Sequence, residues 1–204
     1  LLVQVPTLRH LGFRYRFILD WRDKYLRQIG RIMVPRTLGL AVSQLNLLAM
    51  AVLASKLASG SLAVFNLANN LQSFPVGIFG LSFAVAAFPT MSALVSEPEK
   101  LKVSLTATIR QILFLVIPST VIIVGLRAQI IRVILGSGRF DWQDTILTMR
   151  TLSYFGISIF AQSLNAILVR VFYAYKDSAT PFWISLVSVM VNISLAWLLS
   201  EQLG

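Results

Sequence analysis

The reactive side chains of this sequence lie outside its long apolar stretches. The 204 residues include no cysteine and a single histidine, His10. The eight acidic residues also fall between the apolar stretches: Asp20, Asp23, Glu97, Glu99, Asp141, Asp144, Asp177 and Glu201. The sequence therefore offers no paired acids, no nucleophile with its base and no cluster of metal ligands. We predict that the protein is not an enzyme and that it holds no metal ion or cofactor.

Uncharged polar and small residues, by contrast, recur at helical spacing inside the apolar stretches. One stripe, whose spacing places it on a single helix face, consists of Asn66, Asn69, Asn70, Ser73, Gly77 and Gly80. Shorter stripes are Ser43 with Asn46, Ser158 with Gln162 and Asn165, and Ser185 with Ser188 and Asn192. Such amides can join neighbouring helices at about 0.6 kcal/mol each, and packing accounts for the shorter stripes. Three asparagines near a proline favour a water-filled cavity, with packing as the open alternative.

The apolar stretches predict an all-α integral membrane protein. Hydrophobic residues make up 56% of the chain and charged residues 13%, whereas a soluble domain carries about 25% charged residues. Crossing a bilayer takes roughly 20 apolar residues in a helix, and helices satisfy their own backbone hydrogen bonds there. We expect five spans, at about residues 37–57, 61–94, 103–126, 145–171 and 181–199.

Residues 1–36 are rich in arginine and read as the end of a preceding helix followed by a basic cytoplasmic linker. The linker would fix the orientation of the chain, or it would also hold anionic headgroups at about 1 kcal/mol per basic residue. Twelve basic residues then fall on the inner side and five on the outer side, as the positive-inside rule requires. We attribute the net charge of +10 to this asymmetry and expect no nucleic-acid partner.

As one straight helix, the second span would be about 51 Å long at ~1.5 Å per residue, which exceeds the thickness of the apolar layer. Pro75 and Pro89 each remove a backbone donor, so we predict a kinked helix with Gly77 beside the bend. Residues 128–135 suit a short helix in the membrane interface, ended by the glycines at 136–138. Asp144 is expected to be the N-cap of the next span.

Several motifs resemble those of one transporter family. They are PTLRHLGFR at 6–14, LASGS at 57–61, FPVGIFG at 74–80, FPTMS at 88–92, GSGRF at 136–140 and FYAYKDSATP at 172–181. Together they look like the MurJ/MviN family, the bacterial lipid II flippases of the multidrug/oligosaccharidyl-lipid/polysaccharide exporter superfamily. The resemblance covers nearly the whole chain.

This resemblance implies a protein of two helical lobes that alternates between inward-open and outward-open states. The chain would supply the end of helix 6 through about helix 11, with residues 37–204 forming part of the C-terminal lobe. Both ends of the sequence look cut, so we expect a fragment whose partner is the missing N-terminal lobe. In the family, a cationic cavity grips the diphosphate of the lipid-linked saccharide while its headgroup crosses.

The sequence departs from the family pattern at three positions. Asn70 stands where the family usually has an essential arginine, and Asn69 stands where an acid is common. Met50 stands where some members have a carboxylate for a cation. An amide can donate hydrogen bonds to a phosphate but carries no charge. Three explanations are open: the missing N-terminal lobe supplies the positive charge, the substrate is another lipid-linked molecule, or transport is lost.

The sequence therefore predicts a lipid II flippase of the bacterial inner (cytoplasmic) membrane. Its expected substrate-cavity residues are Arg36, Ser43, Asn46, Asn66, Asn69, Asn70 and Ser73, and its expected kink residues are Pro75, Gly77 and Pro89. One alternative is an exporter of another polyprenyl-linked oligosaccharide or of a drug. Another is a non-transporting scaffold that recruits cell-wall synthesis enzymes through the basic segment. Membrane lipids are expected partners in each case.

Overall fold

The computed structural model describes residues 23–57, 60–135 and 142–203, and these ranges are helical apart from short turns. The elements are α2 (Lys24–Lys56), α3 (Ser61–Pro75), the π-helix η2 (Val76–Leu81), α4 (Ser82–Ala93), α5 (Pro98–Gly125), α6 (Arg127–Leu135), α7 (Trp142–Ala174) and α8 (Ala179–Leu203). With α3, η2 and α4 taken as one continuous segment, five helices are long and apolar enough to cross a membrane. The predicted all-α membrane fold with five spans is confirmed.

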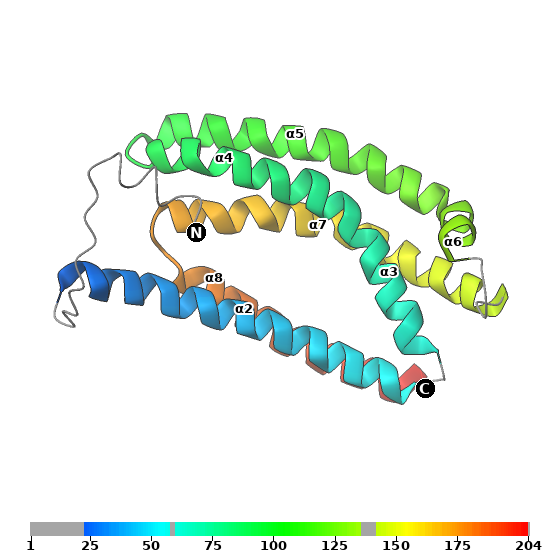
Figure 1. The fold of residues 1–204 in the computed structure, drawn as a ribbon. Coiled ribbons are helices and arrows are strands. Elements are labelled where there is room, and N and C mark those ends of the chain that lie inside the picture. Colours follow the sequence, from blue (N-terminus) through cyan, green and yellow to red (C-terminus); the bar gives the residue numbers. More distant parts are fainter. Residues whose placement is uncertain (1–22, 58–59, 136–141, 204) are drawn as a thin grey trace, which may run out of the picture.

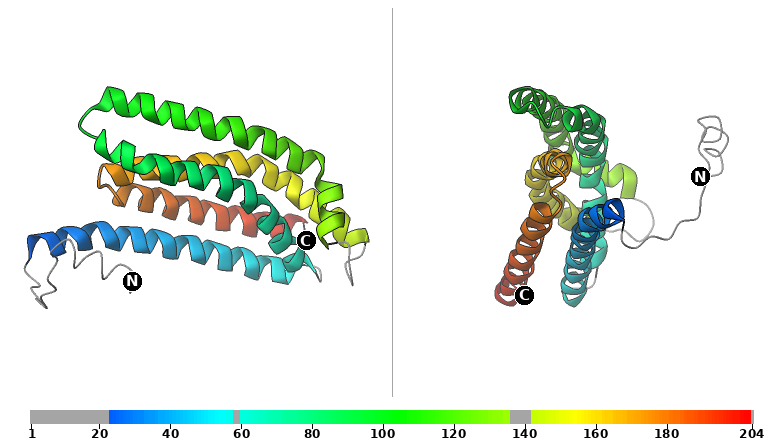
Figure 2. Two further views of the ribbon diagram at one scale, coloured as in Figure 1. Left: turned by 45° about the horizontal axis from the view of Figure 1, so that its top comes forward. Right: turned by 90° about the vertical axis from the view of Figure 1, so that its left-hand side faces the viewer.

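The long helices run side by side and alternate in direction (Figure 1). The start of α2, the α4–α5 turn and the α7–α8 turn lie at one end of the bundle, which we call the basic end because Lys24, Lys100 and Lys176 lie there. Helix α7 is central and packs against α3, η2, α4, α5 and α6, whereas α2 packs mainly against α8. Figure 2 shows the α2–α8 pair on one side of α7 and α5 on the other.

Helix α2 begins at Lys24, earlier than the predicted start at residue 37. The side chain of Asp23 caps this end by accepting a hydrogen bond of 2.6 Å from the backbone N–H of Tyr25. A helix can continue through charged residues where it leaves the apolar layer of the membrane. Residues 24–36, the last part of the predicted linker, are therefore helical. The rest of that segment, residues 1–22, lies outside the described residues.

The second span is bent, as predicted, and the bend follows a change of helix type. The π-helix begins directly after Pro75 and includes Gly77, and the ribbon changes direction between α3 and α4 (Figure 1). Proline lacks the N–H that would continue the α-helical pattern, and a short π-helix accommodates the interruption. Pro89 lies inside α4, which continues to Ala93, and its part in the kink stays a prediction.

The short helix predicted at 128–135 is present as α6. The guanidinium carbon of Arg132 lies 5.1 Å from the ring centroid of Trp142, a cation–aromatic pair of the kind found at membrane interfaces. The predicted glycine stop at 136–138 lies outside the described residues. The predicted N-cap role of Asp144 is wrong: α7 begins at Trp142, so this acid lies in the first turn, where it favours the positive end of the helix dipole.

The turn between α7 and α8 explains part of the FYAYKDSATP motif. Lys176 has a positive φ of 61°, and the carboxylate of Asp177 accepts hydrogen bonds of 3.0 Å from the backbone N–H groups of Ala179 and Thr180. Hydrogen bonds from the Thr180 side chain and from these N–H groups lower the pKa of Asp177. The motif therefore reverses the chain and starts α8.

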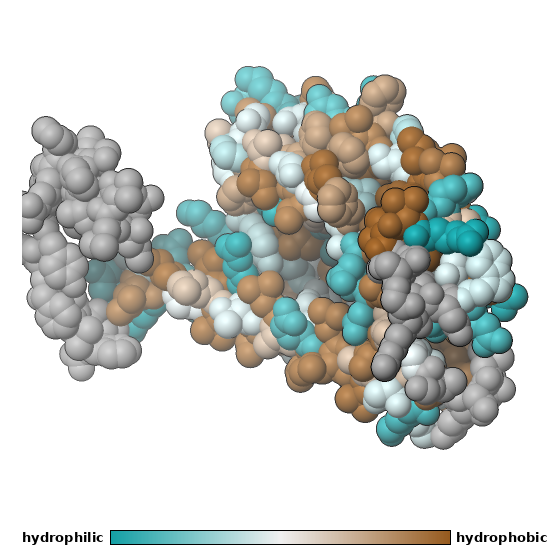
Figure 3. Space-filling view, turned by 45° about the vertical axis from the view of Figure 1, so that its right-hand side comes forward, coloured by the Kyte–Doolittle hydropathy of each residue, from teal (hydrophilic) through white to brown (hydrophobic). Residues whose placement is uncertain are grey.

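Hydrophobic side chains fill the core around α7 and also cover much of the outside. Ala84, Met91, Ile112 and Ile159 belong to one fully buried cluster that joins α4, α5 and α7. Large apolar side chains remain exposed on every long helix, and Figure 3 shows them spread over one face of the molecule. Such a surface is stable against lipid or against further helices rather than against water.

Helix α7 packs closely against the π-helix at Gly80. A Cβ atom added at this glycine would lie 2.7 Å from the Cα of Ser163. We expect Gly80→Ala to lower the free energy of unfolding by about 1–3 kcal/mol, because the two backbones must move apart. Thermal unfolding in detergent measures the change. Gly77→Ala is the matched control, because no atom lies within 4 Å of its added Cβ; equal effects of the two variants would contradict the contact.

Candidate functional site

The predicted polar stripe on the second span is divided by the structure. Asn66, Asn70 and Ser73 are exposed, whereas Asn69 is half-buried. Gly80 is buried against α7 instead of sharing the exposed face. The reason is the π-helix, which has more residues per turn than an α-helix and so shifts the phase of every residue after Pro75. The expectation of one continuous face therefore holds only within α3.

The buried polar centre of the bundle is Gln72, which the sequence analysis did not select. Its side chain is 4% exposed, and its Nε2 donates a hydrogen bond of 2.9 Å to Oδ1 of Asn69. Its Oε1 accepts hydrogen bonds from Ser158 Oγ at 2.9 Å and from Gln162 Nε2 at 3.3 Å, both on α7. Gln162 also donates to Ser158 Oγ at 2.9 Å. The polar network therefore joins α3 to α7.

This network decides between the two readings of the polar stripes, residue by residue. Ser158 and Gln162 have the packing role predicted for their stripe, because their side chains bond across the helix interface. Asn69 belongs to the same contact through Gln72. Gln72 could have been found from its position three residues after Asn69, which is one helical turn.

The exposed face of α3 keeps its amides available. Asn66 and Asn70 are exposed, and the neighbouring Ser73 Oγ donates its hydrogen bond, at 2.7 Å, to the backbone carbonyl of Asn70. An amide placed against hydrocarbon without a partner costs several kcal/mol. In a membrane this face must therefore meet water, a polar ligand or another part of the protein.

The two candidate residues of α2 lie in different surroundings. Ser43 is exposed, and its Oγ donates to the carbonyl of Gly39 at 3.1 Å. Asn46 is half-buried, and its Oδ1 is a buried acceptor without a hydrogen-bond partner among the described residues. A buried acceptor without a partner destabilises the protein by about 1–3 kcal/mol.

Arg36 lies apart from the asparagines. Its guanidinium carbon is 4.9 Å from the ring centroid of Tyr173, near the last turn of α7. Ser158, the α7 residue that bonds to α3, lies about 20 Å from Tyr173 along the axis of α7, at ~1.5 Å per residue. The predicted site residues are therefore separated: the amides lie on α3, Ser43 and Asn46 lie on α2, and Arg36 lies towards the basic end.

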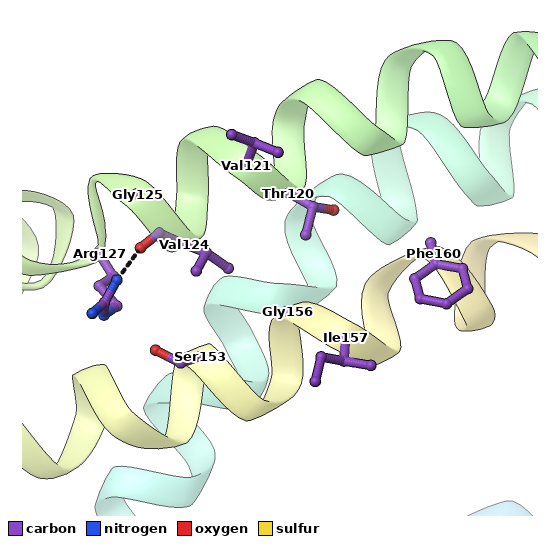
Figure 4. Close-up of a pocket in the computed structure, with 9 residues that line it drawn as sticks. All are labelled: Thr120, Val121, Val124, Gly125, Arg127, Ser153, Gly156, Ile157 and Phe160. Atoms are coloured by element: carbon purple, nitrogen blue, oxygen red, sulfur yellow. Dashed lines mark hydrogen bonds between the residues drawn. The ribbon is translucent and has the colours of Figure 1, made fainter.

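A mainly apolar pocket lies between α5 and α7. It has a volume of about 520 Å³, and in Figure 4 the side chains of Thr120, Val124 and Phe160 line it. Arg127 stands at one end, where its Nη1 donates to the carbonyl of Val124 at 2.6 Å. This pocket contains none of the predicted polar residues, so it is not the site that they define.

Five long apolar helices in the described residues define a multi-pass helical membrane protein. The fold agrees with a solved structure described as "Lipid II flippase MurJ, inward closed conformation". The TM-score is 0.72 at 23% identity, and the match covers 91% of this chain and 39% of that one.

The family follows from sequence comparison. The family model described as "Lipid II flippase MurJ" matches residues 1–204, so the chain belongs to this family. Relatives with the name "Probable lipid II flippase MurJ" include those of Haemophilus influenzae (28% identical over 200 residues, 94% of this chain and 39% of the relative), Thermotoga maritima (32% over 192, 94% and 39%) and Rickettsia prowazekii (33% over 199, 96% and 39%). The chain thus spans about two fifths of the length of these relatives.

Gln72 should stabilise the contact between α3 and α7. We expect Gln72→Leu to lower the free energy of unfolding by about 1–2 kcal/mol, because hydrogen bonds between membrane helices contribute ~0.6 kcal/mol each and their partners lose them together. Thermal unfolding of Gln72→Leu, Ser158→Ala and the double variant measures the coupling. Strictly additive losses would contradict a direct bond. Ser73→Ala is the control, since that hydroxyl bonds only to a carbonyl of its own helix in the structure.

Proposed function

We propose that the protein containing this chain moves lipid II, the lipid-linked precursor of peptidoglycan, across the bacterial inner membrane by alternating access. Family membership over residues 1–204 and the names of the relatives support this proposal. The structural observation that carries it is the exposed amide face of α3, on a span that bends within the apolar layer.

In this proposal the protein lowers the cost of moving a polar headgroup through a membrane without making or breaking a bond. An unpaired polar or charged group in hydrocarbon is very costly, so the headgroup needs hydrogen-bond donors along its path. Asn66 and Asn70 would offer amide N–H groups to sugar or phosphate oxygens, with Ser73 beside them. Ser43 and Asn46 would extend this lining from α2, and Asn69 would be held in place by Gln72.

The bend in the second span is a point at which the inward-open and outward-open states could differ in shape. Alternating access is largely a rocking of one helical unit against another around a fixed site, and π-helices are frequent at functional sites. Gly77 lies in open space within the π-helix, whereas Gly80 is tightly packed on α7. Because α3 also packs on α7, through Gln72, we assign the flexible point of the span to the bend at Gly77.

Because Asn70 is neutral, the α3 face offers no charge to a diphosphate, and that charge would come from other parts of the protein. This observation also favours a second candidate, a transporter of another polyprenyl-linked oligosaccharide whose headgroup needs hydrogen bonds more than charge. A scaffold that recruits cell-wall enzymes is the third candidate. Transport of lipid II by the purified full-length protein in vesicles distinguishes the first candidate from the other two.

Asn70 is the residue on which the proposal is most directly tested. We expect Asn70→Leu in the full-length protein to abolish rescue of a bacterial strain depleted of its lipid II flippase, because the headgroup loses a hydrogen-bond donor in the apolar layer. Asn70→Arg should retain rescue, since a guanidinium donates similar hydrogen bonds and adds charge.

The matched control is Gln111→Leu, which removes an exposed amide from α5 without changing the α3 face. Both leucine variants are compared at equal membrane abundance, measured by immunoblot. Normal rescue by Asn70→Leu would show that this face does not bind the headgroup.

A further inference from the structure

Two arginines from separate helices meet around one tyrosine at the basic end. The guanidinium of Arg36 on α2 stacks over the ring of Tyr173 on α7, at 4.9 Å from the centroid. Arg170 precedes Tyr173 by three residues, one helical turn, and its Nη1 donates to the carbonyl of Ala166 at 2.6 Å. Arg36 and Arg170 are therefore both neighbours of Tyr173, one from α2 and the other from one helical turn earlier on α7.

Such a pair is unfavourable unless an anion balances it. Neighbouring like charges repel, and they repel more strongly at the effective dielectric of a protein surface than in water. Within the described ranges the ion pair found joins Lys100 to Glu97 at 2.5 Å, so neither arginine has a carboxylate partner there. The nearby Asp177 accepts hydrogen bonds from the start of α8 instead.

The position of the cluster identifies the class of anion. Arg170 and Tyr173 lie in the last turns of α7, next to the α7–α8 turn. Tyrosine and arginine at the end of a membrane span mark the level of the lipid headgroups. A guanidinium matches phosphate oxygens through two parallel hydrogen bonds, and Arg36 is exposed while Arg170 is half-buried, so an anion can approach both.

We propose that Arg36 and Arg170, with Arg36 held in place by Tyr173, bind the phosphate group of a lipid headgroup at the basic end of the bundle. Such a phosphate would also join α2 to α7, which otherwise belong to separately packed groups of helices. The phosphate comes from an anionic membrane phospholipid or from the diphosphate of a lipid-linked saccharide. The site is distinct from the amide face of α3 and does not depend on transport.

The test measures binding by the full-length protein in nanodiscs. In one set the discs contain phosphatidylcholine with a fraction of phosphatidylglycerol, and in the other they contain phosphatidylcholine alone with soluble pyrophosphate added. Thermal unfolding midpoints give the apparent affinity. We expect Arg36→Gln and Arg170→Gln each to weaken it about tenfold. Arg36→Lys should weaken it less, because the charge remains. Arg150→Gln, an exposed arginine in the first half of α7, is the control and should match the wild type.

The two sets separate the sources of the phosphate. An arginine-dependent response to phosphatidylglycerol alone identifies a membrane phospholipid, and one to pyrophosphate identifies a diphosphate ligand. No response of the wild type in either set, or equal responses of the wild type and both glutamine variants, would overturn the proposal. Should the variants not fold, phenylglyoxal modification of the wild-type arginines is measured by mass spectrometry. Phosphatidylglycerol or pyrophosphate should protect Arg36 and Arg170 but not Arg150, and equal modification with and without both would also overturn the proposal.

Discussion

A polar group in the apolar layer of a membrane needs a partner, and this constraint organises the whole bundle. The backbone meets it by forming helices, which bond within each segment. Gln72 meets it by accepting hydrogen bonds from Ser158 and Gln162 and donating to Asn69. The amides of Asn66 and Asn70 lie on the opposite, exposed side of α3. Helix α3 therefore carries Gln72, which packs against α7, and the amides of Asn66 and Asn70, which face the surroundings.

The division between the two polar groups depends on the bend after Pro75. If the α-helical pattern continued, Gly80 would lie on the same face as Asn66 and Asn70, as its spacing indicates. The π-helix turns Gly80 towards Ser163 instead, and the absence of a side chain there lets the backbones approach closely. The π-helix is thereby packed closely against α7, while α3 keeps the amides of Asn66 and Asn70 exposed.

The charged groups are arranged differently from the amides. Asn66 and Asn70 on α3 carry no charge, whereas Arg36 and Arg170 lie towards the basic end, next to Tyr173. The amide face of α3 and the arginines at the basic end are therefore two separate polar regions of the bundle.

The sequence by itself determined the membrane class, the number of spans, the bend and the short helix α6. These features depend on properties that act along the chain: the length of uncharged runs, the missing N–H of proline and the pattern of basic residues. The family resemblance was also readable from local motifs. Only the tertiary structure decided which polar residues face one another. Gln72 is 86 residues from Ser158 and 90 residues from Gln162 in the sequence. The phase shift of the π-helix also cannot be derived from residue spacing. The partners of α2 likewise depend on packing between distant segments, which places Arg36 beside Tyr173 rather than beside the asparagines.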